Sequence, residues 1–180
     1  IMESLIKLMK KRYYTPSILG YNFRPTEFQA TIGIEQLKRL NKINKTRRKL
    51  ADYLLKNLQG LKGITLPLQK NKYCKVVPHL ICLQYDEKLT GVKKNIYMKA
   101  LENEGLPVTG GYQLSLYQIY NAFRNISHKK NLKQYPVVEK VIKNSIWLNQ
   151  ARPPATINDM KDIVKIFKKI DKNIHKLKNL

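Results

Sequence analysis

Residues 20–33 read GYNFRPTEFQATIG, and this stretch determines where the longest helix of the chain begins. Thr26 stands where a helix N-cap is expected, and Gln29 follows it three residues later. The two residues form a capping box, in which each side chain accepts a hydrogen bond from the other residue's backbone N–H group. The pattern therefore predicts a helix that starts at Glu27.

The helix predicted from Glu27 is long. Its apolar residues recur at intervals of three or four, or sums of these, until Gly60 and Gly63 end the pattern. At 1.5 Å per residue such a helix spans about 50 Å, more than a small domain requires. We expect it to bridge two parts of a molecule. The apolar stripe consists of Phe28, Ile32, Leu37, Leu40, Ile43, Leu50, Leu54 and Leu58.

Regular patterns also occur on either side of this helix. Residues 1–13 carry apolar side chains at helical spacing and predict a short helix that runs into a loop. Residues 69–72 are polar and predict a loop. Residues 78–85 alternate in polarity like a buried strand, with His79 on the face that carries the largest apolar side chains. Residues 94–104 predict a helix.

The last third of the chain predicts three further elements. Residues 136–143 have the composition of a short helix, and residues 145–148 that of a short strand. Thr156 can cap a closing helix with Asp159 at its third position, and apolar residues continue at helical spacing as far as Leu177. Together the elements predict a small α/β domain with a long entry helix, a few strands, and helices on one face of the sheet.

The charge balance raises the question of a polyanionic partner. The 180 residues include 35 Lys and Arg but 12 Asp and Glu, which gives a formal net charge of +23. The basic residues are mostly Lys and are spread over almost every segment together with many Asn and Ile, a mixture that an AT-rich coding bias also produces. Basic runs more often form a solvated helix face, so we do not expect nucleic acid as a partner.

Cysteine use and hydropathy limit the class of protein. Cys74 and Cys82 are the two cysteines, and neither belongs to a CxxC motif or a His–Cys cluster, so no zinc site and no disulfide framework are predicted. No stretch approaches the ~20 apolar residues of a membrane span. We expect a cytoplasmic protein without a membrane segment. Since the chain opens on Ile1, we also expect it to be part of a longer sequence.

Self-sufficient catalytic motifs are absent from the sequence. It contains no nucleophile elbow, phosphate-binding P-loop, zinc-protease helix or dinucleotide fingerprint, and no paired carboxylates beyond a predicted turn at residues 86–87. The histidines are His79, His128 and His175. His79 is interpreted as a core or interface residue, with a substrate contact as the alternative. The other two lie in Lys-rich, polar surroundings typical of the surface.

Two stretches are nevertheless rich in groups that bind ligands. Residues 20–26 place an amide, a guanidinium and two aromatic rings just before a helix N-terminus, where backbone N–H groups favour anions such as phosphate. Residues 110–117 combine a double glycine with tyrosines that can line a sugar or another ring-shaped ligand. In both stretches, local packing of the aromatic residues is the alternative reading.

The sequence resembles the DegT/DnrJ/StrS sugar aminotransferases. Residues 20–33, followed by Gln36 and Leu37, are similar to the signature with which that family enters its small domain. Further similar segments follow in the expected order over almost the whole chain. They are the Pro-His-Leu at 78–80, LENEGLP at 101–107, residues 111–117, PVVE at 136–139 and Trp-Leu at 147–148.

This resemblance implies a fold-type I pyridoxal phosphate enzyme that works as a homodimer. Residues 1–25 would then be a remnant of the large domain with its linker loop. Residues 26–180 would be the C-terminal small domain, with a mainly antiparallel sheet. The implied reaction moves an amino group from an amino acid donor to a nucleotide-linked keto-sugar or a cyclitol ketone.

The resemblance also implies roles for single residues. Asn22 matches the family's asparagine that reaches across the dimer to the cofactor phosphate. Arg24 matches the arginine of the same motif, which binds a substrate carboxylate or orders the loop. Tyr112 and Tyr117 lie where family members contact substrate, and His79 is a further candidate for a substrate contact. No residue is expected to bind a metal.

The catalytic lysine is the main departure from the family pattern. The family's Schiff-base lysine lies upstream of the signature, and Lys7, Lys10 and Lys11 do not match its context. A second departure is the Asn-Gln at 149–150, where relatives often have Pro-His. We therefore expect a C-terminal fragment that is inactive alone. A stand-alone basic module that binds a polyanion is the alternative hypothesis.

Overall fold

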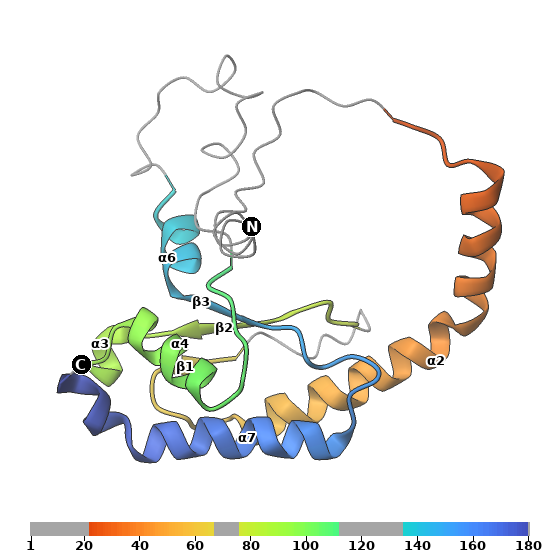
Figure 1. The fold of residues 1–180 in the computed structure, drawn as a ribbon. Helices are drawn as coiled ribbons and strands as arrows, with labels where there is room; N and C mark the ends of the chain where they lie inside the picture. Colours follow the sequence, from red (N-terminus) through yellow and green to blue (C-terminus); the bar gives the residue numbers. More distant parts are fainter. Residues whose placement is uncertain (1–21, 67–75, 112–134, 180) are drawn as a thin grey trace, which may run out of the picture. The chain divides into compact units, whose positions relative to one another are not determined.

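The computed structural model describes residues 22–66, 76–111 and 135–179 of the chain. The chain divides into two compact units, one of residues 25–111 with 143–180, the other of residues 1–24 with 112–142. The predicted helix over residues 1–13 and the predicted loop at 69–72 lie outside the described residues. The larger unit contains the sheet and the core (Figure 1).

Helix α2 (Glu27–Asn57) confirms the long helix that the sequence predicts. Thr26 and Gln29 form the expected capping box, with Thr26 N–H donating to Gln29 Oε1 over 3.0 Å. The helix ends at Asn57 with Leu58 as its C-cap, and the chain then turns at Gly60, whose φ of 82° is a left-handed conformation that side-chain-bearing residues rarely adopt.

Three short strands form an antiparallel sheet in the order β1-β2-β3. They are β1 (Ile64–Thr65), β2 (Ile81–Tyr85) and β3 (Ser145–Leu148). Leu83 of β2 pairs with Ile146 of β3, and Ile81 pairs with Leu148. Because side chains alternate along a strand, this register places large apolar residues of both strands on the same face.

Helices α3 and α4 come directly after β2 in the chain. The short helix α3 (Glu87–Thr90) is capped by Asp86, whose carboxylate accepts from the N–H groups of Lys88 and Leu89, so the predicted turn at this point is one turn of helix. Helix α4 (Lys94–Asn103) confirms the predicted helix, and Leu106 N–H donates to Leu101 O across Gly105, whose φ is 87°.

The C-terminal elements also follow the predictions closely. They are α6 (Pro136–Asn144), β3, α7 (Ile157–Lys172) and the 3₁₀ helix η3 (Ile174–Asn179). Thr156 and Asp159 form the expected capping box of α7. The closing α-helix ends at Lys172 rather than continuing to Leu177, because the chain tightens into the 3₁₀ helix.

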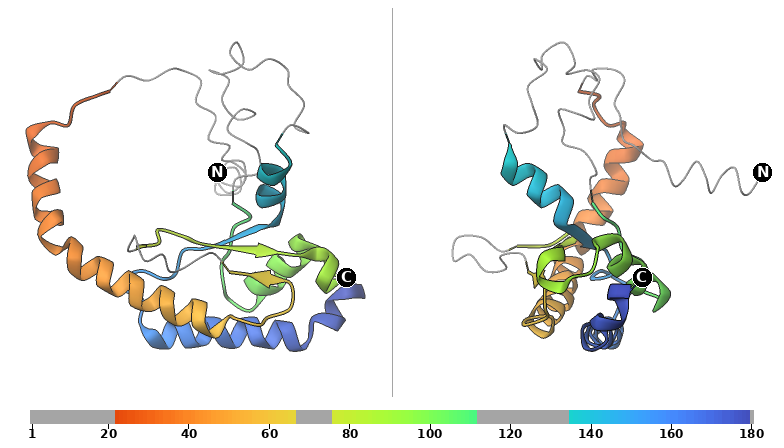
Figure 2. Two further views of the ribbon diagram at one scale, coloured as in Figure 1. Left: turned by 180° about the vertical axis from the view of Figure 1, so that it is seen from behind. Right: turned by 90° about the vertical axis from the view of Figure 1, so that its left-hand side faces the viewer.

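The core lies between one face of the sheet and three helices. Tyr85 of β2 stacks on Tyr97 of α4 with ring centroids 4.4 Å apart, and Tyr97 in turn contacts Phe167 of α7. The C-terminal half of α2 packs beside α7 (Figure 2). The buried Tyr85 hydroxyl is satisfied by Thr90 Oγ1 at 2.7 Å and by Val92 O at 3.0 Å. The expected helices on one sheet face are therefore confirmed.

Polar contacts join the helices to the loops around this core. Asp171 of α7 accepts from Lys62 N–H over 3.1 Å, which holds the turn between α2 and β1 against α7. Lys169 pairs with Glu104 at 2.7 Å and connects α7 with the end of α4. Both pairs are near the surface, so they fix orientation more than they add stability.

In the parts of the chain that the structure describes, no helix combines the length and the apolar character that a membrane span requires.

Candidate functional site

The segment before α2 carries the first predicted site residues. Asn22 and Arg24 are both exposed, and neither side chain has a hydrogen-bond or ion-pair partner among the described residues. Phe23 is exposed as well, so packing does not explain the aromatic ring of this segment. The described part of the segment therefore presents an amide and a guanidinium to the outside.

Among the described residues, two backbone donors in the first turn of α2 have no hydrogen-bond partner. Gln29 N–H donates to Thr26 Oγ1 and Ala30 N–H donates to Thr26 O. Within the described ranges, the N–H groups of Glu27 and Phe28 have no such partner. Unpaired N–H groups at a helix N-terminus favour an anion, although the Glu27 carboxylate already lies in the same turn.

A second candidate region begins where the chain leaves the sheet after Thr109. Thr109 and Trp147 exchange two backbone hydrogen bonds of 2.7 and 3.3 Å. Gly111 has a φ of 74°, and a Cβ atom added there would lie 2.7 Å from the Trp147 ring. Only glycine fits this close approach. Tyr112 and Tyr117, the predicted substrate contacts that follow it, lie outside the described residues.

Lys94 lies beside the same exit from the sheet. Its ammonium group donates to Ser145 O over 3.4 Å and would lie 3.7 Å from a Cβ atom added at Gly110. Burial lowers the pKa of Lys94, the Glu87 carboxylate raises it, and the Lys143 ammonium lowers it. Sequence reasoning missed this residue, because one lysine in a Lys-rich chain gives no sign that it is half-buried.

Lys94 does not match the family's Schiff-base lysine, although a lowered pKa is a property that such lysines share. It comes after the signature at residues 20–33, whereas the resemblance places the catalytic lysine upstream. The Lys94 ammonium also donates to a backbone carbonyl. The described residues therefore supply a half-buried cation here, not a nucleophile.

His79 corrects one expectation from the sequence. It lies in a bend before β2 rather than in the strand, and its side chain is exposed, so the interpretation as a core histidine is wrong. Alternation of polarity placed it on the buried face, but the strand begins two residues later, at Ile81. Beside it, Arg47 Nη1 donates to Pro78 O over 3.5 Å and ties this bend to α2.

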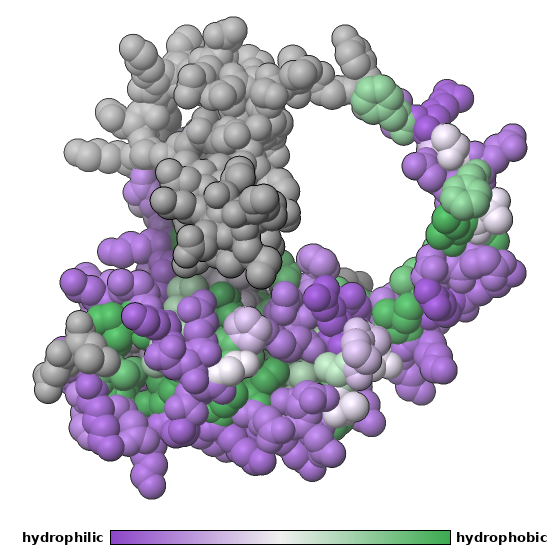
Figure 3. All heavy atoms as spheres, viewed as in Figure 1, coloured by the Kyte–Doolittle hydropathy of each residue, from purple (hydrophilic) through white to green (hydrophobic). Residues whose placement is uncertain are grey.

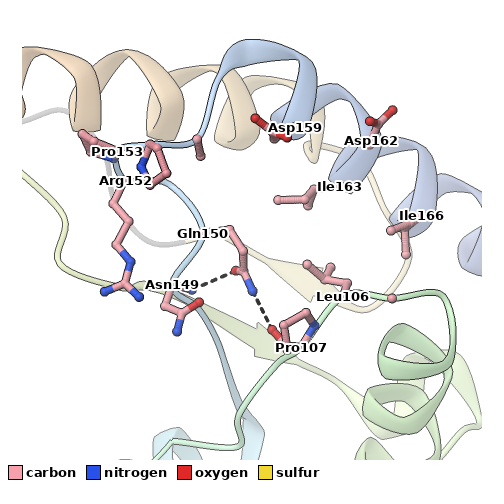
Figure 4. A pocket seen from close by; sticks show the side chains of 13 residues that line it. Leu106, Pro107, Asn149, Gln150, Arg152, Pro153, Asp159, Asp162, Ile163 and Ile166 are labelled. Carbon is pink, nitrogen blue, oxygen red and sulfur yellow. Dashed lines mark hydrogen bonds between the residues drawn. The ribbon is translucent and has the colours of Figure 1, made fainter.

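A hollow of about 590 Å³ opens on the surface of the larger unit (Figure 4). It lies between the end of α4, the loop that follows β3, and the first turns of α7. Its apolar wall includes Leu106, Ile163 and Ile166. Gln150 bridges two of these segments, donating to Pro107 O over 2.6 Å and accepting from Asn149 N–H over 2.9 Å.

The hollow lacks catalytic groups despite its two carboxylates. Asp159 accepts from the side chain and the backbone N–H of Thr156, and these hydrogen bonds hold its pKa below the ordinary value. Asp162 pairs with Lys165 at 2.8 Å. Both carboxylates are thus engaged in the helix itself. Gln150 connects two loops through its hydrogen bonds.

Metal binding has no support in the described part of the chain, where His, Cys, Asp and Glu do not gather in groups of three or more. Cys82 is free, and burial raises the pKa of its thiol, so it is not an activated nucleophile. Two separate candidate regions therefore remain, the segment before α2 and the exit from the sheet at Gly111.

Comparison with known sequences finds relatives over most of the chain. The uncharacterized protein MJ1066 of Methanocaldococcus jannaschii is 28% identical over 159 residues, which are 88% of this chain and 40% of the relative. The spore coat polysaccharide biosynthesis protein SpsC of Bacillus subtilis is 33% identical over 92 residues, which are 51% of this chain and 23% of SpsC.

Comparison with solved structures finds the same fold in sugar aminotransferases. The putative sugar aminotransferase Spr1654 from Streptococcus pneumoniae, in its PMP form, matches with a TM-score of 0.71 and 18% identity. The match covers 91% of this chain and 40% of Spr1654. At this identity the likeness shows the fold alone.

The chain spans about 40% of the length of MJ1066 and of Spr1654. It is thus a fragment relative to these proteins, as the sequence predicted. The family described as DegT/DnrJ/EryC1/StrS aminotransferases matches residues 4–168. This range includes the segment before α2, the sheet and most of α7, and the chain therefore belongs to the DegT/DnrJ/EryC1/StrS aminotransferase family.

Proposed function

We propose that this chain is the small-domain part of a pyridoxal phosphate-dependent aminotransferase, and that Asn22 binds the phosphate of the cofactor. The observation that carries the proposal is the family match over residues 4–168 together with the exposed Asn22 before a capped helix. The proposed acceptor is a nucleotide-linked keto-sugar or a cyclitol ketone, and the proposed donor is an amino acid.

The residues of this segment fit a phosphate group. The exposed Asn22 carboxamide supplies an N–H donor for such a group. Pyridoxal phosphate supplies the electron sink for moving the amino group when it is bound. Asn22 holds and orients that phosphate, while the other groups of the reaction belong to the rest of the enzyme.

The substrate-side residues are proposed on the same basis. Arg24 binds a carboxylate or orders the segment, and Tyr112 and Tyr117 contact the sugar ring. His79 is exposed in the bend before β2 and is available for a hydrogen bond to substrate. We further propose that the full-length enzyme is a cytoplasmic homodimer, and that this chain alone has no activity because it contains no lysine that matches the Schiff-base position.

Activity measurements test the proposal in two steps. The 180-residue chain, incubated with pyridoxal phosphate, an amino donor and a keto-sugar, is expected to show no turnover. The chain extended upstream by the in-frame genomic sequence before Ile1 is expected to transfer amino groups. Turnover by the chain alone, or none by an extended protein that binds the cofactor, contradicts the proposal.

A matched pair of variants tests Asn22 in the extended protein. Asn22→Ala is expected to weaken pyridoxal phosphate binding about tenfold, which corresponds to ~1.4 kcal/mol and is typical of one hydrogen bond to a charged group. Asn41→Ala, a substitution of an exposed asparagine within α2, is expected to leave cofactor binding unchanged. Equal effects of the two substitutions would argue against the role of Asn22.

A second candidate function rests on a basic stripe of α2, defined by Lys38, Lys42, Lys45 and Lys49. These residues recur at intervals of four, three and four, so they share one side of the helix, and all are exposed. A polyanion such as nucleic acid fits this stripe. Binding of unrelated DNA sequences at about 50 mM salt that weakens as salt rises would support it, and no binding at that salt excludes it.

A further inference from the structure

The chain leaves the sheet at two consecutive glycines. Gly110 and Gly111 follow Thr109, whose backbone exchanges hydrogen bonds of 2.7 and 3.3 Å with Trp147 of β3. Glycine has no side chain to pack and more backbone freedom than any other residue, so two glycines in a row do not fix their own course. Gly111 nevertheless adopts a left-handed conformation with a φ of 74°. Neighbouring side chains therefore have to hold this part of the chain.

The Trp147 ring lies directly against the second glycine. A Cβ atom added at Gly111 would lie 2.7 Å from Cε2 and 2.8 Å from Nε1 of the ring. Trp147 is itself held in the sheet, because it pairs with Cys82 of β2 and is flanked in β3 by the buried Ile146 and Leu148. The ring thus forms a fixed wall for Gly111.

Lys94 of α4 lies beside the first glycine. Its ammonium nitrogen would be 3.7 Å from a Cβ atom added at Gly110, and it donates to Ser145 O over 3.4 Å. The backbone N–H group of Lys94 donates to Glu87 Oε1 over 2.8 Å, so both ends of the residue are held. Lys94 therefore connects α4, β3 and the exit of the chain from the sheet.

The half-buried position of Lys94 is an exception in this chain. Among the lysines that the structure describes, Lys94 alone is not exposed. Figure 3 shows the usual arrangement along α7, where hydrophilic residues line the visible side of the helix. Burying an ammonium group costs free energy unless it is paired, and no described carboxylate forms an ion pair with Lys94. A methionine would pack here without that cost, so the ammonium group is placed for the contact it makes rather than for stability.

We propose that Lys94 and Trp147 are positioning residues, which hold Gly110 and Gly111 and thereby direct the chain as it leaves the sheet towards residues 112–117. Both act through the backbone of a glycine and not on the substrate itself. Residues 112–117 include the two tyrosines proposed above as substrate contacts, so the inference rests on the proposed function for its effect on the reaction.

The fluorescence of Trp147 tests the contact with Gly111 without any assay of activity, because Trp147 is the single tryptophan of the chain. Gly111→Ala in the 180-residue chain forces a Cβ atom against the ring, and it should shift the emission maximum and increase quenching by acrylamide. Gly60→Ala is the matched control, since Gly60 has a similar φ of 82° but a Cβ atom there would have no other atom within 4 Å. If both variants keep the emission and quenching of the unsubstituted chain, the contact is overturned.

Amide hydrogen exchange in the same chain tests Lys94. Lys94→Met removes the charge, and the amide hydrogens of Thr109 and Trp147 should then exchange about tenfold faster, as expected for the loss of one hydrogen bond to a charged group. Lys94→Arg retains a charged donor and should restore slow exchange. Lys99→Met, at an exposed lysine of the same helix, should leave exchange unchanged.

Urea unfolding separates positioning from a merely structural role of Lys94. Because Lys94→Met removes a half-buried charge, the free energy of unfolding should not fall. Unchanged exchange at Thr109 and Trp147 overturns the role of Lys94. A fall in the free energy of unfolding large enough to account for the faster exchange also overturns it, since Lys94 would then stabilise the fold as a whole.

The chain extended upstream connects this role with the reaction. Lys94→Met should raise the KM for the acceptor ketone about tenfold and leave pyridoxal phosphate binding unchanged, because a displaced contact segment weakens substrate binding. Lys94→Arg should restore the KM. An unchanged KM in an active enzyme overturns the effect on substrate. An extended protein that is inactive with its native residues contradicts the proposed function, while fluorescence and exchange still decide whether the two residues hold the glycines.

Discussion

The two halves of α2 share one apolar stripe but have different surroundings. Leu37 in the N-terminal half is 66% exposed, and Leu54 in the C-terminal half is fully buried against the core. Both belong to the same predicted apolar stripe, and both lie in one uninterrupted helix of 31 residues. The comparison teaches that an apolar stripe predicts a surface to be covered, without saying whether the same domain covers it.

The two halves of α2 also differ in the interactions that stabilise their helical conformation. The N-terminal half depends on its own hydrogen bonds and on the Thr26–Gln29 capping box, whereas packing on α7 stabilises the C-terminal half. Most helical stability in proteins comes from such packing. In the isolated chain, the first turns of α2 should therefore open more readily than the last turns, which amide hydrogen exchange can measure.

The largest expected difference between the halves comes from removing one buried leucine. Leu54→Ala should lower the free energy of unfolding by about 2–5 kcal/mol, because it loses burial and leaves a cavity. Leu37→Ala should change it by less than ~0.5 kcal/mol, since its side chain is already mostly in water. Urea unfolding followed by circular dichroism checks both values. Similar losses of unfolding free energy for the two variants would show that the two halves of α2 do not differ in burial.

The next largest effect concerns the capping box of α7, a helix that packs on the core along its length. Thr156→Ala removes the acceptor for Asp159 N–H and a donor to the Asp159 carboxylate. The expected loss is about 1 kcal/mol in the free energy of unfolding. Thr156→Ser retains the hydroxyl group and should recover most of the stability in the same urea measurement. If Thr156→Ser is as unstable as Thr156→Ala, the lost stability comes from the threonine methyl group and not from its hydroxyl group.

The same box makes the stability of α7 sensitive to pH. Hydrogen bonds from Thr156 hold the Asp159 pKa below its ordinary value, so this contribution is fully present above the unfolded pKa of about 3.9 and is lost as pH falls through the lower folded value. Asp159→Asn should therefore reduce the drop in urea midpoint between pH 6 and about pH 3. The box of α2 has neutral Gln29 at this position, and Gln29→Ala should leave that drop unchanged.

The smallest global effect is expected at the N-terminus of α2. Thr26→Ala breaks a capping box of the same kind as that of α7, yet the turns that it caps carry no core residue. The free energy of global unfolding should change by less than ~0.5 kcal/mol, while amide exchange speeds up over residues 27–33. A loss as large as that of Thr156→Ala would mean that the N-terminal half of α2 is coupled to the core.

Much of the fold could be predicted from the sequence. The start of α2, the strand at residues 145–148, the helix α4 and the cap of α7 were each predicted to within a residue or two. The candidate site was harder to predict from the sequence. Asn22 and Arg24 came from a motif, whereas the burial of Lys94 and the bridge made by Gln150 depend on segments that are far apart in the sequence.

The sequence by itself determined where α2, α4 and α7 begin and the family of the chain, because caps and motifs act over a few neighbouring residues. Only the tertiary structure decided which half of α2 is buried, that His79 is exposed, and that Gly111 lies against the Trp147 ring. Burial depends on which distant segments meet, and the same apolar stripe satisfies its pattern whether α7 or another part of the enzyme covers it.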